Sequence, residues 1–254
     1  MRDVLCALAA GEITVAEAES RLAGYATTDS GRFDAARQGR SGVPEAVLGE
    51  GKPPEAVADL AEAALETTGR AIVTRTTADQ RDALRTMLDR EGHEDASVEM
   101  TPEGGTVVVH APGFDRPSLS ATVAVVTAGT SDAGPAGEAA VIAREMGATV
   151  ERVDDVGVAG IHRLFATIET IRAADVAVVA AGREGALPTV VAGLVDSPVI
   201  GLPVSVGYGQ GGNGEAALLG MLQSCAALSV VNVDAGFVAG AQAGLIARAV
   251  DGGG

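Results

Sequence analysis

Aromatic side chains are nearly missing from this sequence. Tryptophan is absent and aromatic residues make up 2% of the chain, although 47% of its 254 residues are hydrophobic. Ala, Val, Leu and Gly must therefore fill any core, which suits close packing of helices against a sheet. The length is compatible with one large domain or with two smaller ones.

Positive charge is also scarce. The chain has 18 Lys and Arg residues against 34 Asp and Glu, a formal charge of −16 and a pI of about 4.5. Since phosphate backbones and anionic membranes require a cationic face, we expect no nucleic acid and no membrane as partners. Lys52 is the single lysine, and this acidic, lysine-poor composition resembles that of halophilic archaeal proteins. Lys52 either supplies a functional point charge or is a lysine retained by chance on a surface turn.

Cysteines and long apolar runs are equally limited. Cys6 and Cys225 are the only cysteines, and two so far apart suggest neither a disulfide framework nor a zinc site. Residues 1–22 predict two short helices around a Gly-Glu turn. Their apolar run is too short and too interrupted for a signal peptide or a membrane span, so we expect a cytoplasmic protein.

The chain contains two regions that differ in composition and in hydrophobic pattern. Residues 1–118 are charged and predict a mixed α/β region. It would contain a helical pair, an irregular stretch, helices near 56–66 and 78–90, and strands at 71–75 and 106–111. The segment PGFDRPS at 112–118 predicts a linker, because its two prolines fit neither a helix nor a sheet interior.

Residues 119–254 form the second region, where apolar runs such as ATVAVVTAG and DVAVVAAG alternate with amphipathic segments. Short continuous Val, Ile and Ala runs between helices are typical of a parallel sheet covered on both faces. Five such β-α units predict a doubly wound parallel sheet in a three-layer α/β sandwich.

In such a sheet, ligands bind beyond the carboxyl ends of the strands. Four of the five loops that follow the expected strands are rich in glycine, and the helices beginning there present backbone amides to phosphate or carboxylate. The same loops carry the side chains best suited to chemistry: Ser131, Asp132, His162, Glu184 and Tyr208.

Each of these residues also has a plainer interpretation. Ser131 and Asp132 could hold ribose or phosphate oxygens, or only cap a helix, a contribution of about 1 kcal/mol. Glu184 could be a general base or a carboxylate favoured by a helix dipole. His162 could be functional, a cap or a surface residue. The tract GYGQGGNG could cover a site, cradle phosphate or only be flexible. It does not match the Walker pattern, and it does not match the dinucleotide GxGxxG motif in its required strand-turn-helix setting, which disfavours a Rossmann dehydrogenase.

Cys225 follows an apolar, helix-like run and precedes an expected buried strand. Buried cysteines mostly act as small inert hydrophobes, which is the interpretation that we give to Cys6. Because Cys225 ends a helix, any activation would have to come from neighbouring groups rather than from a helix amino terminus.

Five segments of the second region resemble LarB, the PurE-like carboxylase/hydrolase family of nickel-pincer nucleotide biosynthesis. They are TAGTSDAGPAGEAA, DVGVAGIHRL, GREGALPTVVAGLV, PVIGLPVSVGYG and ALLGMLQSC…VVNVDAGF. The stretch FDAARQGRSGVPEAVLGEGK is similar to the charged region that precedes the catalytic domain in that family. Together these segments span nearly the whole chain in the family's order.

The resemblance implies a specific reaction. LarB-type enzymes carboxylate the pyridinium ring of nicotinic acid adenine dinucleotide at C5 with CO2 or bicarbonate. They also hydrolyse the phosphoanhydride to release AMP, and they require Mg²⁺. The resemblance makes Cys225 the catalytic nucleophile, places Ser131 and Glu184 at active-site positions, and implies a homo-oligomer, an octamer in that family.

Further roles are hypotheses built on this resemblance. Glu184 or His162 would remove the C5 proton, and Ser131 with Asp132 would hold CO2, the nicotinate carboxylate or the ribose. The other substrate-binding positions that we assign are two cations for the pyrophosphate and four loop residues: Arg40, Lys52, Gly129, Gly185, Tyr208 and Gly209. The Mg²⁺ ligands stay open, with three candidates: Asp132, Asp155 and Glu184.

The sequence departs from the family pattern near the cysteine. Ala227-Leu228 stands where many relatives have a Pro-Gly turn, and Ala235 stands where Asn is common, so the loop around Cys225 is less defined. Two other functions stay open. A PurE-like carboxylase or mutase acting on an aminoimidazole ribonucleotide would need no thiol, since that ring is already an enamine. A non-catalytic nucleotide sensor would use the same crevice.

Overall fold

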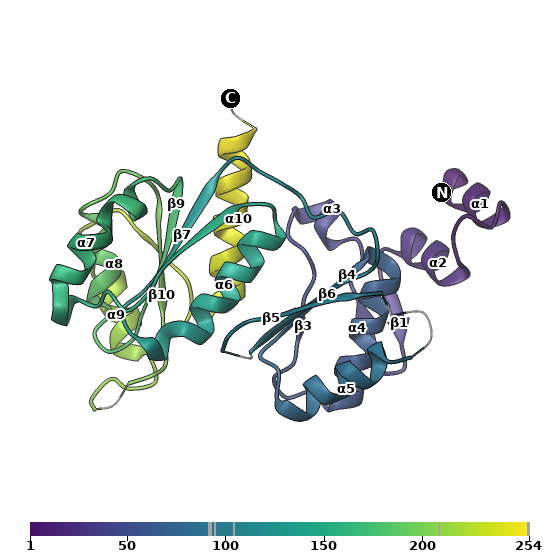
Figure 1. Cartoon of the computed structure of the whole chain (residues 1–254), viewed down its shortest axis with the longest axis horizontal. Helices are drawn as coiled ribbons and strands as arrows, with labels where there is room; N and C mark the ends of the chain where they lie inside the picture. Colours follow the sequence, from purple (N-terminus) through teal and green to yellow (C-terminus); the bar gives the residue numbers. More distant parts are fainter. Residues whose placement is uncertain (91–92, 94, 104, 208, 253–254) are drawn as a thin grey trace. The chain divides into compact units, whose positions relative to one another are not determined.

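The computed structural model describes residues 1–90, 93, 95–103, 105–207 and 209–252 (Figure 1). The chain divides into two compact units, Met1–Asp115 and Arg116–Gly254. This division falls inside the segment 112–118 that the sequence analysis expects to be a linker. Among the described residues, none of the helices combines the length and the apolarity that a membrane crossing requires.

The first unit is a mixed α/β structure. Its four-stranded sheet has the order β3-β4-β6-β5, in which only the β3–β4 pair is parallel, and β1 and β2 form a separate antiparallel pair. Its elements in chain order are α1 (Arg2–Ala9), α2 (Val15–Ala23), β1 (Ala26–Thr28), β2 (Gly31–Phe33), α3 (Arg37–Ser41), β3 (Val47–Leu48), α4 (Pro54–Thr68), β4 (Arg70–Thr74), α5 (Ala78–Leu88), β5 (Ser97–Met100) and β6 (Thr106–His110).

Helix α4 carries the core of the first unit. Its sequence places Ala and Leu at helical spacing, and Val57, Ala61 and Ala64 are completely buried against the sheet residues Val73 and Val109. Helix α4 begins at two prolines, whose fixed φ suits a first turn, and ends at a left-handed glycine. The small side chains let the helix lie close to the sheet without aromatic filling.

The second unit is a five-stranded, all-parallel sheet with helices on both faces, which confirms the predicted doubly wound fold. The strand order is β11-β10-β9-β7-β8. The elements are β7 (Thr122–Thr127), η1 (Thr130–Asp132), α6 (Ala133–Glu145), β8 (Thr149–Val153), η2 (Val158–Gly160), α7 (Ile161–Arg172), β9 (Val176–Ala181), α8 (Ala186–Ala192), β10 (Val199–Pro203), α9 (Glu215–Leu222), β11 (Ser229–Val230) and α10 (Gly236–Asp251).

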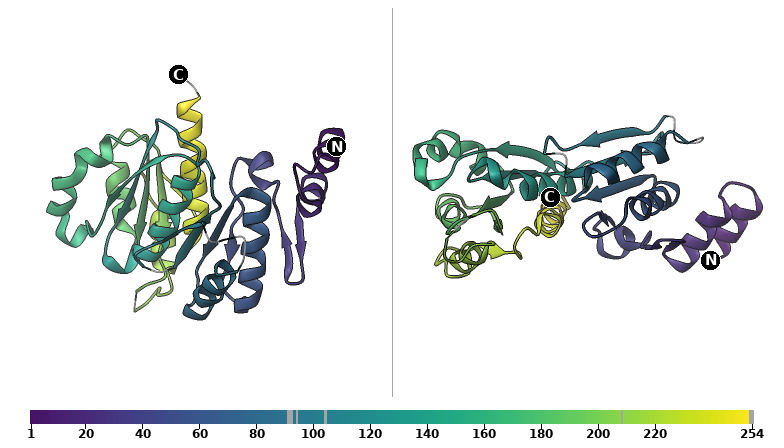
Figure 2. Two further views of the ribbon diagram at one scale, coloured as in Figure 1. Left: turned by 45° about the vertical axis from the view of Figure 1, so that its right-hand side comes forward. Right: turned by 90° about the horizontal axis from the view of Figure 1, so that it is seen from below.

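Alternating side chains of β7 separate the two faces of this sheet. Val123 and Val125 pack into one hydrophobic cluster with residues of α6 and α10. Ala124 and Val126 belong to a second cluster with residues of α7, α8 and α9. Figures 1 and 2 show these two groups of helices on opposite sides of the sheet. Burial on both faces explains why the strands are continuously apolar.

Glycine residues allow α10 to pack closely against α6. A Cβ atom added at Gly240 would lie 2.4 Å from the carbonyl oxygen of Ala139, and one at Gly236 would lie 2.3 Å from that of Pro135. Gly244 continues the same stripe one turn later, where a Cβ would lie 2.6 Å from the sulfur of Met146. The two helices therefore touch backbone to backbone, which compensates for the missing aromatic residues.

Candidate active site

Strand order places the switch point of the sheet at the carboxyl ends of β7 and β9. These strands are neighbours in the sheet although β8 lies between them in sequence. The chain leaves β7 toward α6 on one face and leaves β9 toward α8 on the other face. The two connecting loops therefore diverge, and such a switch point is where open α/β sheets bind ligands.

The loop after β7 turns back on itself through Asp132. The backbone amide of Gly129 donates to Oδ2 of Asp132 at 2.8 Å, and the amide of Asp132 donates to the carbonyl of Gly129 at 3.1 Å. Asp132 is only 3% exposed, whereas Ser131 is exposed. Burial raises the pKa of Asp132 above its ordinary value and outweighs the backbone amides of Gly129, Ala128 and Gly182, which lower the pKa.

The loop after β9 presents Arg183 and Glu184 to solvent. Gly185, the left-handed residue that follows them, has no room for a side chain, since a Cβ there would lie 2.5 Å from the carbonyl oxygen of Ala217 in α9. A second contact with α9 involves Gly220, where a Cβ would lie 2.2 Å from the carbonyl oxygen of Glu184. The backbone of this loop is thus pressed along α9.

A pocket of about 180 Å³ opens beside this loop. Its lining combines the Arg183–Glu184 pair with a glycine-rich segment that follows β10: Val206, Gly207, Gln210, Gly211, Gly212, Gly214 and Ala216. The volume is below the ~300 Å³ at which drug-sized ligands begin. The pocket can therefore hold one ring or one charged end of a dinucleotide, with a cation and a carboxylate beside it.

Non-glycine residues with positive φ lie mainly in the loops that follow the strands of the second unit. Among the described residues, five non-glycine residues have positive φ, and four of them follow β8, β9, β10 and β11: Asp155, Arg183, Asn213 and Asp234. Asp and Asn adopt this conformation more readily than other non-glycine residues, whereas an Arg at φ 53°, as at position 183, is uncommon. Concentrated strain of this kind is typical of functional loops.

The structure brings most of the predicted loop residues to this edge of the sheet. Gly129, Ser131 and Asp132 follow β7, and Glu184 and Gly185 follow β9, the neighbouring strand. Gly209 lies in the glycine-rich segment after β10, and Tyr208 lies outside the described residues. Arg183 lines the pocket but is not among the site residues predicted from the sequence. Its position beside Glu184 in a Gly-Arg-Glu-Gly turn is the sequence feature that could have identified it.

His162 lies farther along the edge. It is the exposed second residue of α7, which follows the outermost strand β8. Asp155 in the same connection donates its amide to Oγ1 of Thr127 at 3.0 Å, and its carboxylate pairs with Arg163 at 2.5 Å. Asp155 thus connects the loop after β8 to the end of β7, with its charge compensated locally.

Cys225 does not belong to a loop that follows a strand. It is exposed and lies between the end of α9 and the start of β11. Ser229, the first residue of β11, is level with Ile200, the second residue of β10, so the chain before it lies toward the amino ends of the strands. Helix α9 connects the two places, since Ala216 in its first turn lines the pocket and Cys225 follows its last turn.

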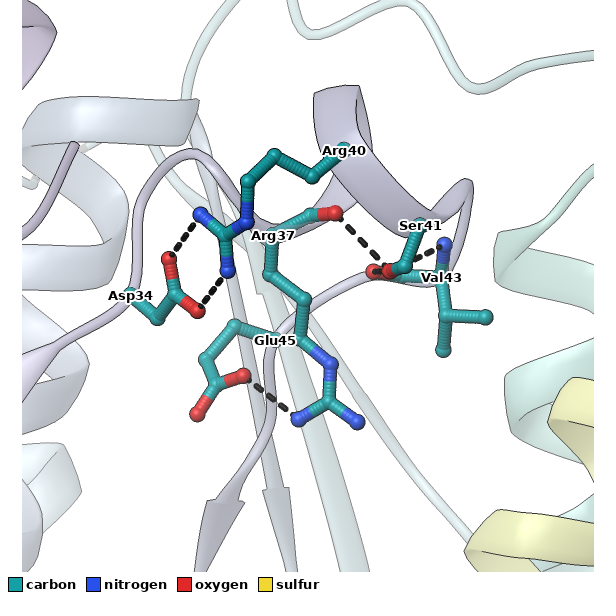
Figure 3. Close-up of polar contacts among 6 residues, drawn as sticks. All are labelled: Asp34, Arg37, Arg40, Ser41, Val43 and Glu45. Carbon is teal, nitrogen blue, oxygen red and sulfur yellow. Dashed lines mark hydrogen bonds and ion pairs between the residues drawn. The ribbon is translucent and has the colours of Figure 1, made fainter.

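Arg40 and Lys52 belong to the first unit, where each has a local partner. The guanidinium of Arg40 donates two hydrogen bonds, of 2.9 and 2.5 Å, to the carboxylate of Asp34 (Figure 3). This pairing lowers the pKa of Asp34 and raises that of Arg40. Arg37 pairs with Glu45 at 2.7 Å. The ammonium of Lys52 donates to the carbonyl oxygen of Leu48 at 2.8 Å.

The described residues offer no ready-made metal site. Within this part of the chain, no three His, Cys, Asp or Glu side chains come together in a way that could hold a metal ion. Asp132 is buried among backbone amides and Asp155 is paired with Arg163. The three candidate ligands therefore do not form a protein-only Mg²⁺ centre.

Comparison with known proteins covers both units. Residues 25–104 match the family model described as the LarB/PurE-like N-terminal domain, and residues 122–252 match the model described as AIR carboxylase. An uncharacterized protein of Methanocaldococcus jannaschii is 36% identical over 254 residues. That alignment covers 98% of this chain and 97% of the other protein.

Proposed function

Because the chain belongs to the LarB family of PurE-like proteins, a membership that indicates a carboxylase-type enzyme, we propose a specific substrate for it. The protein carboxylates the pyridinium ring of nicotinic acid adenine dinucleotide at C5 and hydrolyses the phosphoanhydride. The products are pyridinium-3,5-biscarboxylic acid mononucleotide and AMP. The observation that carries the proposal is the exposure of Cys225, since a buried thiol could not reach a substrate ring.

The chemistry requires a nucleophile that can add and leave again. A pyridinium ring is electron-poor and does not attack CO2. Addition of the Cys225 thiolate at C4 gives a neutral dihydropyridine in which C5 is an enamine carbon. C5 then forms a bond to the carbon of CO2, a base removes the C5 proton, and the C4–S bond breaks to restore the aromatic ring. The thiolate is regenerated, so no oxidant is consumed.

Glu184 is the base that the structure supports best. It is exposed beside the pocket, and its backbone contacts α9 at Gly220, five positions before Cys225. Cys225 itself lies past the last turn of α9, so the proposal requires the substrate ring to lie between that end of the helix and the pocket. His162 lies beyond the neighbouring loop, on the far side of β7 from β9. We therefore assign proton removal to Glu184, and we assign ligand contact to the exposed hydroxyl of Ser131.

Hydrolysis of the phosphoanhydride is a separate step in which water attacks one phosphorus atom and AMP leaves. Mg²⁺ would supply charge neutralisation at the phosphates, bound largely through substrate oxygens as this ion commonly is. Since the described residues do not form a metal centre, we assign none of the chain's residues to the ion. Arg40 and Lys52 remain our proposed pyrophosphate contacts.

One experiment tests the proposal directly. The full chain is incubated with nicotinic acid adenine dinucleotide, bicarbonate and Mg²⁺, and the mixture is analysed for AMP and for a mononucleotide heavier than nicotinic acid mononucleotide by one CO2. Cys225→Ala should lower the rate on the order of a thousandfold or more, because the covalent step is lost. Cys6 is also exposed, which contradicts the packing role that we expected for it from the sequence. Cys6→Ala is therefore the matched control, and it should retain full activity.

A second function has a specific observation in its favour. The model that matches residues 122–252 is described as AIR carboxylase, so an aminoimidazole ribonucleotide is an alternative substrate. That ring is already an enamine and needs no covalent activation. Carboxylation of an aminoimidazole ribonucleotide by both the native chain and Cys225→Ala would establish this alternative and contradict the proposal above.

A further inference from the structure

Arg183 lines the pocket of about 180 Å³ beside Glu184, and the proposed reaction leaves it without a role. Among the described residues that line this pocket, Arg183 is the one cation and Glu184 is the one anion. The rest of the lining consists of glycine, alanine, valine and glutamine residues. A negatively charged group that enters the pocket is therefore attracted by Arg183 and repelled by Glu184.

Close backbone contacts fix the loop that carries Arg183. A Cβ atom at Gly182, the preceding residue, would lie 2.4 Å from the carbonyl oxygen of Val206, in the segment that follows β10. A Cβ atom at Gly207 would lie 3.7 Å from the amide nitrogen of Arg183 and 3.9 Å from its Cδ. The stem of the Arg183 side chain therefore lies alongside Gly207, which lines the same pocket.

The backbone conformation of Arg183 is unfavourable for an arginine. Its φ is 53°, in the left-handed region that glycine and asparagine adopt at less cost. Folding alone would therefore favour glycine or asparagine at this position. A strained residue at the carboxyl edge of an open α/β sheet, where ligands commonly bind, indicates a use for its side chain.

The size of the pocket restricts which part of a dinucleotide can enter it. Nicotinic acid adenine dinucleotide carries negative charge on its ring carboxylate, at one end, and on its two phosphates, in the middle. The phosphates lie between two riboses, so they cannot enter a pocket of about 180 Å³ by themselves. The ring carboxylate is an end group and can enter.

An arginine also distinguishes a carboxylate from a carboxamide. The guanidinium presents parallel N–H donors that match the two oxygens of a carboxylate. A carboxamide offers one oxygen and an NH2 group, whose hydrogens would face the donors of the guanidinium. The nicotinic acid and nicotinamide dinucleotides differ only in this group, so an arginine at the ring substituent separates the two molecules.

We propose that Arg183 is the specificity-determining residue of the pocket, because it binds the ring carboxylate of nicotinic acid adenine dinucleotide and selects this substrate over the nicotinamide dinucleotide. The identity of the substrate rests on the proposed function. The neighbouring Glu184 then lies beside the same ring as its base, and the charge of Arg183 offsets the repulsion between the two carboxylates.

Carboxylation of the two dinucleotides tests this role, since they have identical phosphates and differ only at the ring substituent. The native chain should prefer the acid by about a hundredfold or more in kcat/KM. Arg183→Asn, which suits the positive φ, should lower this preference by about thirtyfold or more through a higher KM for the acid. Arg183→Lys should restore part of the preference, since the charge returns without the paired donors.

Arg172→Gln is the matched control for these variants. Arg172 ends α7 at the opposite edge of the sheet, just before β9, and pairs with Glu169 at 2.7 Å. The substitution removes the same charge from the same unit and should leave the preference unchanged. An equal loss for both dinucleotides in Arg183→Asn would indicate contact with the shared phosphates and overturn the proposal. So would an unchanged preference in Arg183→Asn, or an equally large loss in Arg172→Gln.

Binding separates this role from the proposed reaction. Calorimetric titration of the Cys225→Ala chain with each dinucleotide measures reversible binding and requires no turnover. The acid should bind at least about tenfold more tightly than the amide, and Arg183→Asn in the same background should remove the difference. If this preference is present but the native chain forms no carboxylated product, the proposed function fails and the role of Arg183 stands. Equal binding of both dinucleotides, or binding of neither, overturns the role of Arg183.

Discussion

Asp132 illustrates how one residue can be unfavourable for folding and still be retained. Its burial raises the pKa of the carboxyl group above the usual value of 3.8, despite the lowering effect of the amides of Gly129, Ala128 and Gly182. Ionisation of Asp132 is therefore harder in the folded chain than in the unfolded chain. A buried carboxylate with such a cost, placed at the edge where open α/β sheets commonly bind ligands, is a common sign of a functional constraint.

The pH dependence of stability follows from the direction of this shift. Since the folded-state pKa is raised, the contribution of Asp132 to stability is fully present below the unfolded value of 3.8 and is lost as pH rises through the folded-state pKa. Relative to Asp132→Asn, which cannot ionise, the native chain should lose free energy of unfolding as pH rises above 3.8. Urea denaturation of both proteins over a pH series measures this difference, and a difference that stays flat or grows in favour of the native chain would contradict it.

Residues at the site were only partly predictable from the sequence. The Ser131-Asp132 pair could be placed after a strand, because an apolar run precedes it and a helix pattern follows. Which of the two side chains faces solvent depends on the short turn η1, and no periodicity predicts a three-residue turn. Cys225 was harder still, because its position depends on where β11 begins, and this strand has only two residues.

Among the elements, α10 and α6 depend most on the absence of side chains. Because a Cβ at Gly240 would come within 2.4 Å of a backbone oxygen of Ala139, no flexible side chain can move aside to relieve it. We expect Gly240→Ala to lower the free energy of unfolding by about 1–3 kcal/mol through overpacking. Chemical denaturation measures the change.

Gly134 in α6 is the control for this substitution. A Cβ at that position would meet nothing within 4 Å, and the residue is helical. Gly134→Ala should therefore raise the free energy of unfolding by about 0.5–1 kcal/mol, by reducing the freedom of the unfolded chain. Equal effects of the two substitutions, or a stable Gly240→Ala protein, would show that the helices can move apart at little cost.

The larger elements were predictable for a clear reason. Long amphipathic segments and buried Val and Ala runs produce strong periodicity, so α4, α5 and the strands β7 and β9 lie where the pattern predicts them. The stretch expected to be irregular contains β1, β2, β3 and α3, which have two to five residues each. Elements of that length are set by contacts with the rest of the unit and leave no period in the sequence.

At the scale of the whole molecule, the main feature is the large negative net charge. With a formal charge of −16, self-repulsion opposes the compact state, and salt should relieve it because the Debye length falls to about 3 Å at 1 M. We expect the Tm at pH 7 to rise by at least about 3 °C between 0.05 and 1 M NaCl, roughly 1 kcal/mol for a chain of this size.

The same salt series near the pI of about 4.5 is the control. The net charge is close to zero there, so the gain from salt should shrink. An equal gain at both pH values would indicate that salt acts through the exclusion of ions from the surface and not through the charge of the chain.

The single lysine allows selective chemical labelling of the chain. The ammonium of Lys52 is held at the carbonyl of Leu48, between strand β3 and helix α4 of the first unit. An amine-reactive fluorophore can acylate only this side chain and the α-amino group, so one conjugation reaction restricts the probe to two known positions, both in the first unit, without prior mutagenesis. A change in its emission on addition of a dinucleotide would be a direct optical readout of whether the first unit takes part in binding.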